Sequence, residues 1–198
     1  MSTITVDGIA YNTNNLANYH PGGKLFVELF DGKDATEVFA AYHRRKFPHQ
    51  KLHCMAENND KLMDEKYDPE YQKLSSEINR ILPIHKSFAP WYYYVKILVL
   101  LGVTFYTEWN IHVHGAYYWY NMAFLGWLFA LVGLNIQHDA NHGAISRYFP
   151  VNRVLGMTQN WIGGSAIDWM HQHIVQHHVY CNNADYDPDI HGNLLLRL

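Results

Sequence analysis

The feature that most constrains this fold is the absence of any formal charge between Glu108 and Asp139. Within this stretch, residues 117–136 are predominantly apolar and match the length of about 20 residues that one bilayer crossing requires. Residues 91–107, which precede it, carry a single charge, Lys96. Two such stretches in succession predict two membrane-spanning helices joined as a hairpin. Two buried helices of a soluble core are the alternative interpretation.

Positive charges on both sides of the predicted hairpin set its expected orientation. The connecting loop at 110–115 contains no Lys or Arg, whereas Arg80 and Lys86 precede the first apolar stretch and Arg147 and Arg153 follow the second. Basic residues are enriched in cytoplasmic loops of membrane proteins. We therefore expect both flanks of the hairpin to lie on the cytoplasmic side.

Three further features refine the membrane part. The aromatic run Trp91-Tyr92-Tyr93-Tyr94 is typical of an interfacial belt, and Lys96 is expected to extend its amine toward the membrane surface. Residues 154–167 are uncharged but too short to span, so they are interpreted as an interfacial or re-entrant segment.

Composition excludes several classes of protein. The 198 residues are 48% hydrophobic and 15% aromatic, which excludes a disordered chain. A net charge of -3 gives no electrostatic footprint for nucleic acid, so no nucleic-acid partner is expected. The two cysteines, Cys54 and Cys181, are too few for a disulfide framework, and each is interpreted as structural.

The N-terminal 3–47 segment reads as a compact folded unit. Alternating residues around the turn signal Asp7-Gly8 predict a β-hairpin. A Pro-Gly-Gly turn at 21–23 precedes apolar residues at helical spacing, and 34–37 reads as a capping box that opens a further helix. A mixed-charge connector follows, with a helix expected over 68–81.

Two histidines of this unit suggest haem ligation. His20 lies beside the glycines of the turn, and His43 lies at the end of the second predicted helix. Two imidazoles facing each other across an apolar slot leave no open iron position, so such a haem would transfer electrons and would not bind oxygen. The alternative is a surface turn histidine and a helix-terminal histidine that interacts with the helix dipole.

These residues resemble the haem-binding core of the cytochrome b5 family. The similarity is carried by the runs 6–11, 20–23 and 34–36 and by His43. It implies that His20 and His43 bind haem b.

Two histidine clusters follow the predicted hairpin. His138 and His142 are four residues apart, as are His173 and His177, with His178 directly after them. Residues four apart share a helix face, and neutral imidazole is a common metal ligand. Asp139 is a candidate hydrogen-bond acceptor that orients a ligating ring. His171 has the wrong spacing for that face and is given a minor supporting role.

A zinc-protease interpretation of the first cluster is disfavoured. That motif needs a glutamate directly after the first histidine, and the chain has Asp139 there. The three carboxylates Asp185, Asp187 and Asp189, which follow the second cluster, are interpreted as a loop-capping group, with a metal role as the less favoured reading.

The clusters resemble two of the three histidine boxes of membrane-bound fatty acid desaturases. The run 170–182 followed by Asp185 and 187–189 is similar to the front-end acyl-lipid subfamily, whose members carry an N-terminal cytochrome b5 domain. The resemblance implies a di-iron site with the following ligands in this chain: His138, His142, His173, His177 and His178. A third box is absent before Leu198, so the five ligands leave that site incomplete. The chain is therefore expected to be the N-terminal part of a desaturase, without turnover by itself.

The predicted fold class is an α+β cytochrome b5-like haem domain followed by an incomplete all-α transmembrane domain. We expect a shortened haem domain at 1–50, a connector at 51–90 and the membrane domain at 91–198. The resemblance implies an oxygen-dependent oxidoreductase that acts on acyl lipids in the endoplasmic reticulum membrane. It also implies O2 as co-substrate and an NADH-dependent cytochrome b5 reductase as electron donor. Alternatives are a membrane-anchored b5-type electron carrier, and a sphingolipid desaturase or hydroxylase.

Overall fold

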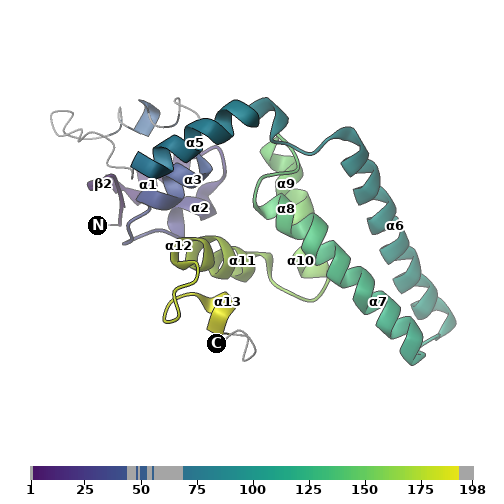
Figure 1. The fold of residues 1–198 in the computed structure, drawn as a ribbon. Coiled ribbons are helices and arrows are strands. Elements are labelled where there is room, and N and C mark those ends of the chain that lie inside the picture. Colours follow the sequence, from purple (N-terminus) through teal and green to yellow (C-terminus); the bar gives the residue numbers. More distant parts are fainter. Residues whose placement is uncertain (1, 44–47, 49, 53–54, 56–68, 192–198) are drawn as a thin grey trace. The chain divides into compact units, whose positions relative to one another are not determined.

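The structure is a computed structural model that describes residues 2–43, 48, 50–52, 55 and 69–191. The chain divides into two compact units, Met1–Ile84 with His171–Leu198 and His85–Met170, and each is described by itself. The first contains the small sheet and the second the two long helices (Figure 1). This is the order of α+β unit and helical part that the sequence predicts.

A two-stranded antiparallel sheet opens the first unit. Strands β1 (Thr3–Val6) and β2 (Ile9–Asn12) pair with Val6 opposite Ile9. Asp7 and Gly8 between them have φ angles of 53° and 76°, the left-handed values that a type I′ turn requires. The predicted hairpin is therefore confirmed.

Three short helices follow the sheet: α1 (Thr13–Tyr19), α2 (Lys24–Glu28) and α3 (Thr36–Tyr42). The sequence prediction did not include α1, although Asn12 is a typical N-cap residue. Its side-chain oxygen accepts a hydrogen bond from the backbone N–H of Asn15 at 3.1 Å.

The capping box predicted at 34–37 is wrong in detail. Ala35 is the N-cap of α3, and it makes no side-chain capping bond. The Asp34 carboxylate instead accepts from the backbone N–H of Thr36 at 2.9 Å and from its hydroxyl at 2.6 Å. A carboxylate that bonds two residues ahead closes a local turn before the helix begins.

The first unit has one apolar core. Ile4, Val6 and Tyr11 of the sheet are buried there, as are Val27 and Phe30 from the α2 region. Each Å² of apolar surface that these side chains remove from water stabilises the fold by about 25 cal/mol. The core also includes side chains of α1 and α3, the helices that end at His20 and His43.

Four further elements belong wholly or mainly to this unit. They are α5 (Pro69–Ile81), the π-helix η4 (Met170–His177), α12 (His178–Tyr180) and α13 (Pro188–His191). The short helix η2 (Ile84–Lys86) lies at the boundary, with its last two residues in the second unit. Helix α5 confirms the helix expected over 68–81. Val175 of η4 is buried in the same core as the sheet.

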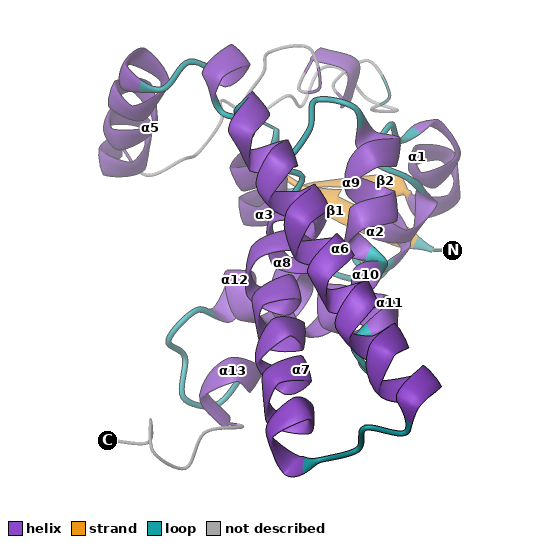
Figure 2. Ribbon diagram, turned by 90° about the vertical axis from the view of Figure 1, so that its right-hand side faces the viewer, coloured by secondary structure: helices purple, strands orange, loops and turns teal. Residues whose placement is uncertain are grey.

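The second unit is built on a helical hairpin. Helix α6 (Trp91–His114) ends at Gly115, and a short loop leads to α7 (Trp119–Val132), the π-helix η3 (Gly133–Gln137) and α8 (His138–Asn141). The hairpin is seen in Figure 2. Two segments, Ile84–His114 and Trp119–Asn141, are long and apolar enough to cross a membrane.

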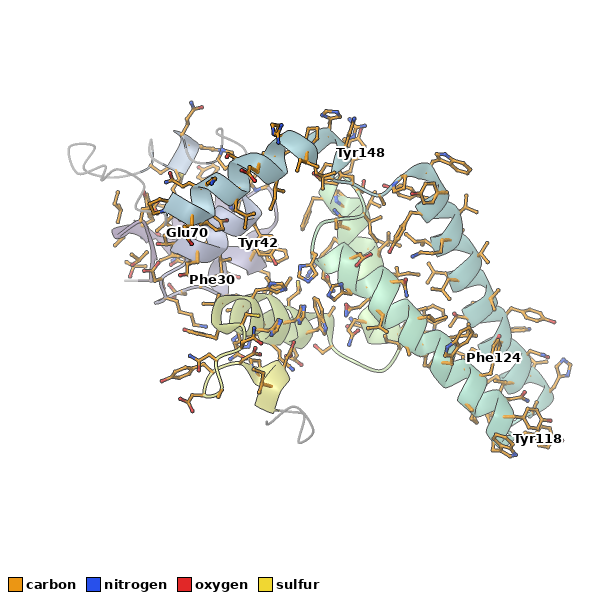
Figure 3. The ribbon with its side chains drawn as sticks, viewed as in Figure 1. Phe30, Tyr42, Glu70, Tyr118, Phe124 and Tyr148 are labelled. Atoms are coloured by element: carbon orange, nitrogen blue, oxygen red, sulfur yellow. The ribbon has the colours of Figure 1, made fainter. Side chains whose placement is uncertain are left out.

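Most side chains of the hairpin lie outside the protein core. Only 11% and 17% of the apolar windows of the two segments are buried. Tyr118 at the loop end and Phe124 on α7 are examples, with exposed fractions of 59% and 45% (Figure 3). Two buried helices of a soluble core would hide these surfaces, so the exposure favours the predicted spans.

The predicted aromatic belt is only half correct. Trp91 and Tyr92 are exposed, but Tyr93 and Tyr94 turn inward and donate hydrogen bonds within the unit. Lys96 donates to the side-chain oxygen of Asn135 at 3.1 Å and lies over the Tyr93 ring. Lys96 thus has a polar partner on the neighbouring helix, and its extension toward the membrane surface remains a prediction.

Three short helices complete this unit: α9 (Phe149–Gly156), α10 (Thr158–Trp161) and α11 (Ala166–Trp169). The indole N–H of Trp161 donates to the Glu108 carboxylate at 2.8 Å. Glu108 lies about 26 Å along α6 from Trp91 at the usual helical rise. Residues 154–167 therefore reach the hairpin through Trp161, and their interpretation as an interfacial or re-entrant segment remains a prediction.

Candidate functional site

Two histidines of the first unit face each other. His20 lies in the turn between α1 and α2, and His43 is the C-cap of α3. Their ring centroids are 5.8 Å apart with an angle of 72° between the planes. Two imidazoles that face each other in this way would be able to hold a haem.

Both rings are fixed through the same nitrogen. Nδ1 of His20 lies 3.2 Å from the carbonyl oxygen of Gly23, and Nδ1 of His43 lies 2.9 Å from that of Phe39. A carbonyl oxygen only accepts, so each Nδ1 carries the hydrogen. In each ring Nε2 then carries the lone pair that a metal ion would need, so the pair fits the donor set for a haem iron.

Gly22 gives the His20 ring its space. A Cβ atom at this residue would lie 2.8 Å from Cε1 of His20 and 3.2 Å from its Nδ1. Burial lowers the pKa of His20, and the hydrogen bond to Gly23 opposes that change. The ring therefore favours the neutral form that a metal ligand needs.

The first histidine cluster lies at α8, which begins at His138 and has His142 as its C-cap. The rings of His138 and His142 are 4.6 Å apart, and the Trp169 ring packs at 5.7 Å from the first and 5.9 Å from the second. The π-helical η3 comes directly before this cluster, and π-helical turns occur often at functional sites.

A hydrogen-bonded chain connects this cluster to α6. Nδ1 of His138 donates to the Asp139 carboxylate at 3.1 Å. The other oxygen of Asp139 accepts from the Tyr93 hydroxyl at 2.5 Å, and that hydroxyl also lies 2.5 Å from the carbonyl oxygen of Asn135. Asp139 thus contacts His138 as the sequence predicts, whereas the contribution of Tyr93 was not anticipated.

The second cluster lies on and just after the π-helix η4. The ring of His173 lies 4.9 Å from both His177 and His178, and those two rings are 5.3 Å apart. A π-helix turns less per residue than an α-helix, because its hydrogen bonds join residues five apart. Residues four and five positions after His173 therefore come to the same side of the helix.

Two carboxylates hold this cluster. Nδ1 of His177 lies 2.9 and 3.0 Å from the two oxygens of Asp187, and Nδ1 of His173 lies 2.9 Å from Asp189. Asp187 is fully buried. Burial alone raises the pKa of Asp187, but hydrogen bonds from His177 and from the backbone N–H groups of Asn182 and Asp189 outweigh it, and the pKa is lowered.

The loop-capping interpretation of the three aspartates is therefore incomplete. Asp187 and Asp189 contact histidines as well as the loop. Of the three aspartates, only Asp185 is exposed. Cys181 is a free, exposed cysteine and not a packed one, while Cys54 lies outside the described residues. His171 is half-buried.

The donor set of the second cluster suits a metal ion. His173, His177 and Asp189 each offer an atom within 4.8 Å of the others. Imidazole nitrogen is a good ligand for iron, zinc and copper. The two histidine clusters belong to different units, so each is considered by itself.

Comparison with known families matches both parts of the chain. Residues 2–77 match the cytochrome b5-like heme/steroid binding domain, and residues 116–197 match the fatty acid desaturase family. The chain joins a cytochrome b5-like domain to a fatty acid desaturase domain. This confirms the family resemblance and the fold class that the sequence predicts. The domain boundaries expected at residues 50 and 90 remain predictions.

The curated relatives that match the chain carry the names of fatty acid desaturases. The chain is 42% identical to an acyl-lipid (7-3)-desaturase of Rebecca salina, over 98% of this chain and 44% of the relative. It is 39% identical to a protein of the same name from Diacronema lutheri, over 99% of this chain and 44% of the relative. An acyl-lipid (8-3)-desaturase B of Dictyostelium discoideum is 30% identical over 94% of this chain and 42% of the relative. The chain thus spans less than half the length of these relatives. No solved structure matches it.

The contact between Tyr93 and Asp139 gives a testable consequence for stability. Tyr93→Phe removes a hydroxyl that donates to a carboxylate, and we expect a loss of about 1 to 2 kcal/mol in the free energy of unfolding. Tyr92→Phe is the matched control, because the Tyr92 side chain is exposed. Unfolding by SDS titration in mixed micelles measures the difference. Equal stability of the two variants would contradict the role of this hydrogen bond.

Proposed function

We propose that this chain belongs to an oxygen-dependent, front-end acyl-lipid desaturase that receives electrons through its cytochrome b5-like domain. The observation that carries the proposal is the order of domains, shared with relatives named acyl-lipid desaturases over nearly the whole chain. Because the chain spans less than half of those relatives, the activity concerns the longer protein.

In this proposal His20 and His43 hold haem b, and their geometry supports the assignment. Both rings have Nδ1 bonded to a backbone carbonyl, and they face each other at 5.8 Å. A haem with two imidazole ligands would supply reversible one-electron transfer. The covalent link to the desaturase domain keeps this group at a high effective concentration near its acceptor.

The same proposal assigns iron ligands in the desaturase domain. They are His138, His142, His173, His177 and His178 as part of a di-iron site, supported by the ring clusters described above. Bound iron would supply O2 activation and removal of two hydrogens from an acyl chain, since no side chain is oxidising enough. The protein's own part is to orient the imidazoles, through Asp139, Asp187 and Asp189.

The remaining partners follow from this chemistry. We propose an NADH-dependent cytochrome b5 reductase as the electron donor and an acyl chain carried by a membrane lipid as the substrate. The two apolar helices and the basic flanks support a multi-pass protein of the endoplasmic reticulum membrane. The haem domain and both histidine clusters are then cytoplasmic.

The haem assignment predicts a spectroscopic result. His20→Ala and His43→Ala should each abolish the low-spin, six-coordinate spectrum of the purified chain after addition of haemin, because each removes one of the two histidines that would hold the haem. His85→Ala, at an exposed histidine of η2, is the control and should leave the spectrum unchanged. A six-coordinate spectrum that survives in both variants would contradict the assignment.

The orientation predicts a pattern of protease access. Protease added outside sealed microsomes should remove the N-terminal domain and leave the hairpin protected, because both flanks are proposed to face the cytoplasm. Detergent is added in the control so that the lumenal loop is also exposed. An N-terminal domain that is cut only after detergent addition would overturn the orientation.

Activity is tested with the complete reading frame that contains this chain. Expressed in yeast supplied with polyunsaturated fatty acids, it should form a product with a new double bond between an existing one and the carboxyl end. His177→Ala should lower that product more than about 100-fold, since loss of an outer hydrogen-bond partner alone costs about 10- to 100-fold. His85→Ala should keep it. A hydroxylated product, or none from an iron-loaded protein, would contradict the proposal.

A further inference from the structure

The second histidine cluster is held by a loop that is built around one buried carboxylate. Asp187 has no exposed surface, and its hydrogen bonds among the described residues come from within the segment 177–189. Its Oδ1 accepts from the backbone N–H of Asp189 at 2.9 Å, and its Oδ2 accepts from that of Asn182 at 2.9 Å. Both oxygens also lie within 3.0 Å of Nδ1 of His177.

We propose that Asp187 and Asp189 are positioning residues, which hold the Nδ1–H groups of His177 and His173 so that each ring presents Nε2 to a metal ion. The inference rests on the proposed function, because it takes the two histidines as metal ligands. It adds to that function two carboxylates that determine which nitrogen of each ring binds the metal ion.

The geometry separates this role from direct ligation. The two nitrogens of an imidazole lie on opposite sides of the ring, so a carboxylate at Nδ1 and a metal at Nε2 are kept apart. Both oxygens of Asp187 are occupied by backbone and imidazole donors. Metal-binding histidines usually donate their other N–H to a carboxylate or carbonyl, which fixes the tautomer and raises the basicity of the ligand.

The two carboxylates differ in how firmly they are fixed. Asp187 needs both oxygens as acceptors, and an asparagine there would direct its NH2 group at one of the two backbone N–H donors. The Asp189 side chain is 33% exposed and accepts from His173 at 2.9 Å and from the Gln172 amide at 3.2 Å. It also lies 3.5 Å from Nδ1 of His177. Asp189 is therefore the safer residue to replace without loss of the loop.

The first test reads the tautomers in the metal-free full chain in detergent micelles. Nitrogen-15 NMR of histidine-labelled protein distinguishes rings protonated at Nδ1 from rings protonated at Nε2. Single His173→Gln and His177→Gln variants assign the signals. We expect Asp189→Ala to move His173 away from the Nδ1–H form, and Asp187→Ala to do so for His177. Asp189→Asn keeps an acceptor oxygen and should largely preserve the parent signal.

Asp185→Ala is the matched control. Asp185 lies in the same loop but is exposed, and it contributes its backbone N–H to the side chain of Asn183. Its replacement should leave both tautomers unchanged. If Asp189→Ala also leaves the tautomer of His173 unchanged, the proposal is overturned, whatever the result for Asp187→Ala.

The second test measures binding of Co2+ to the same proteins by the visible absorption of the bound ion. We expect Asp187→Ala and Asp189→Ala to weaken binding by about 10- to 100-fold, and Asp185→Ala to leave it unchanged. If His177→Ala abolishes binding while both aspartate variants bind like the parent, the positioning role fails and the ligand assignment stands. If His173→Ala and His177→Ala both bind like the parent, the ligand assignment of the proposed function fails.

Discussion

The candidate sites depend on one interaction, the hydrogen bond that fixes Nδ1 of an imidazole. It occurs at His20 and His43 with backbone carbonyls, and at His138, His173 and His177 with carboxylates. In each case the acceptor determines where the ring hydrogen lies, and Nε2 becomes the atom available to a metal. A histidine without such a partner would divide its population between two tautomers and several rotamers.

The difference between the acceptors matches the difference between the two proposed iron sites. A neutral carbonyl orients the ring with little effect on its charge, which suits a haem that carries its own four nitrogen ligands. A carboxylate makes the imidazole a stronger donor, which suits iron held by side chains alone. Local structure provides each geometry: a glycine-rich turn and a helix end for the haem pair, and π-helical turns at or directly before both histidine clusters.

Periodicity and motif spacing were sufficient to predict the N-terminal hairpin, the two apolar helices and the grouping of the histidines, because those features are local along the chain. Contacts between distant residues were not predictable in this way. Tyr93 looks like a belt residue by composition, yet it donates to Asp139, 46 positions later. Asp187 and Asp189 follow their histidines by 10 and 16 positions. Their role depends on how the loop folds back, which no pattern of residue types records.

The most direct test of the central claim is cobalt K-edge X-ray absorption of the full chain loaded with Co2+. The account predicts a first shell that includes several imidazole nitrogens, with the outer scattering of ordered rings and no sulfur. His177→Ala should lower the imidazole contribution. A shell of carboxylate oxygens without imidazole, or a sulfur ligand from Cys181, would contradict it, because the aspartates or the thiol would then bind the metal that the histidines are claimed to hold.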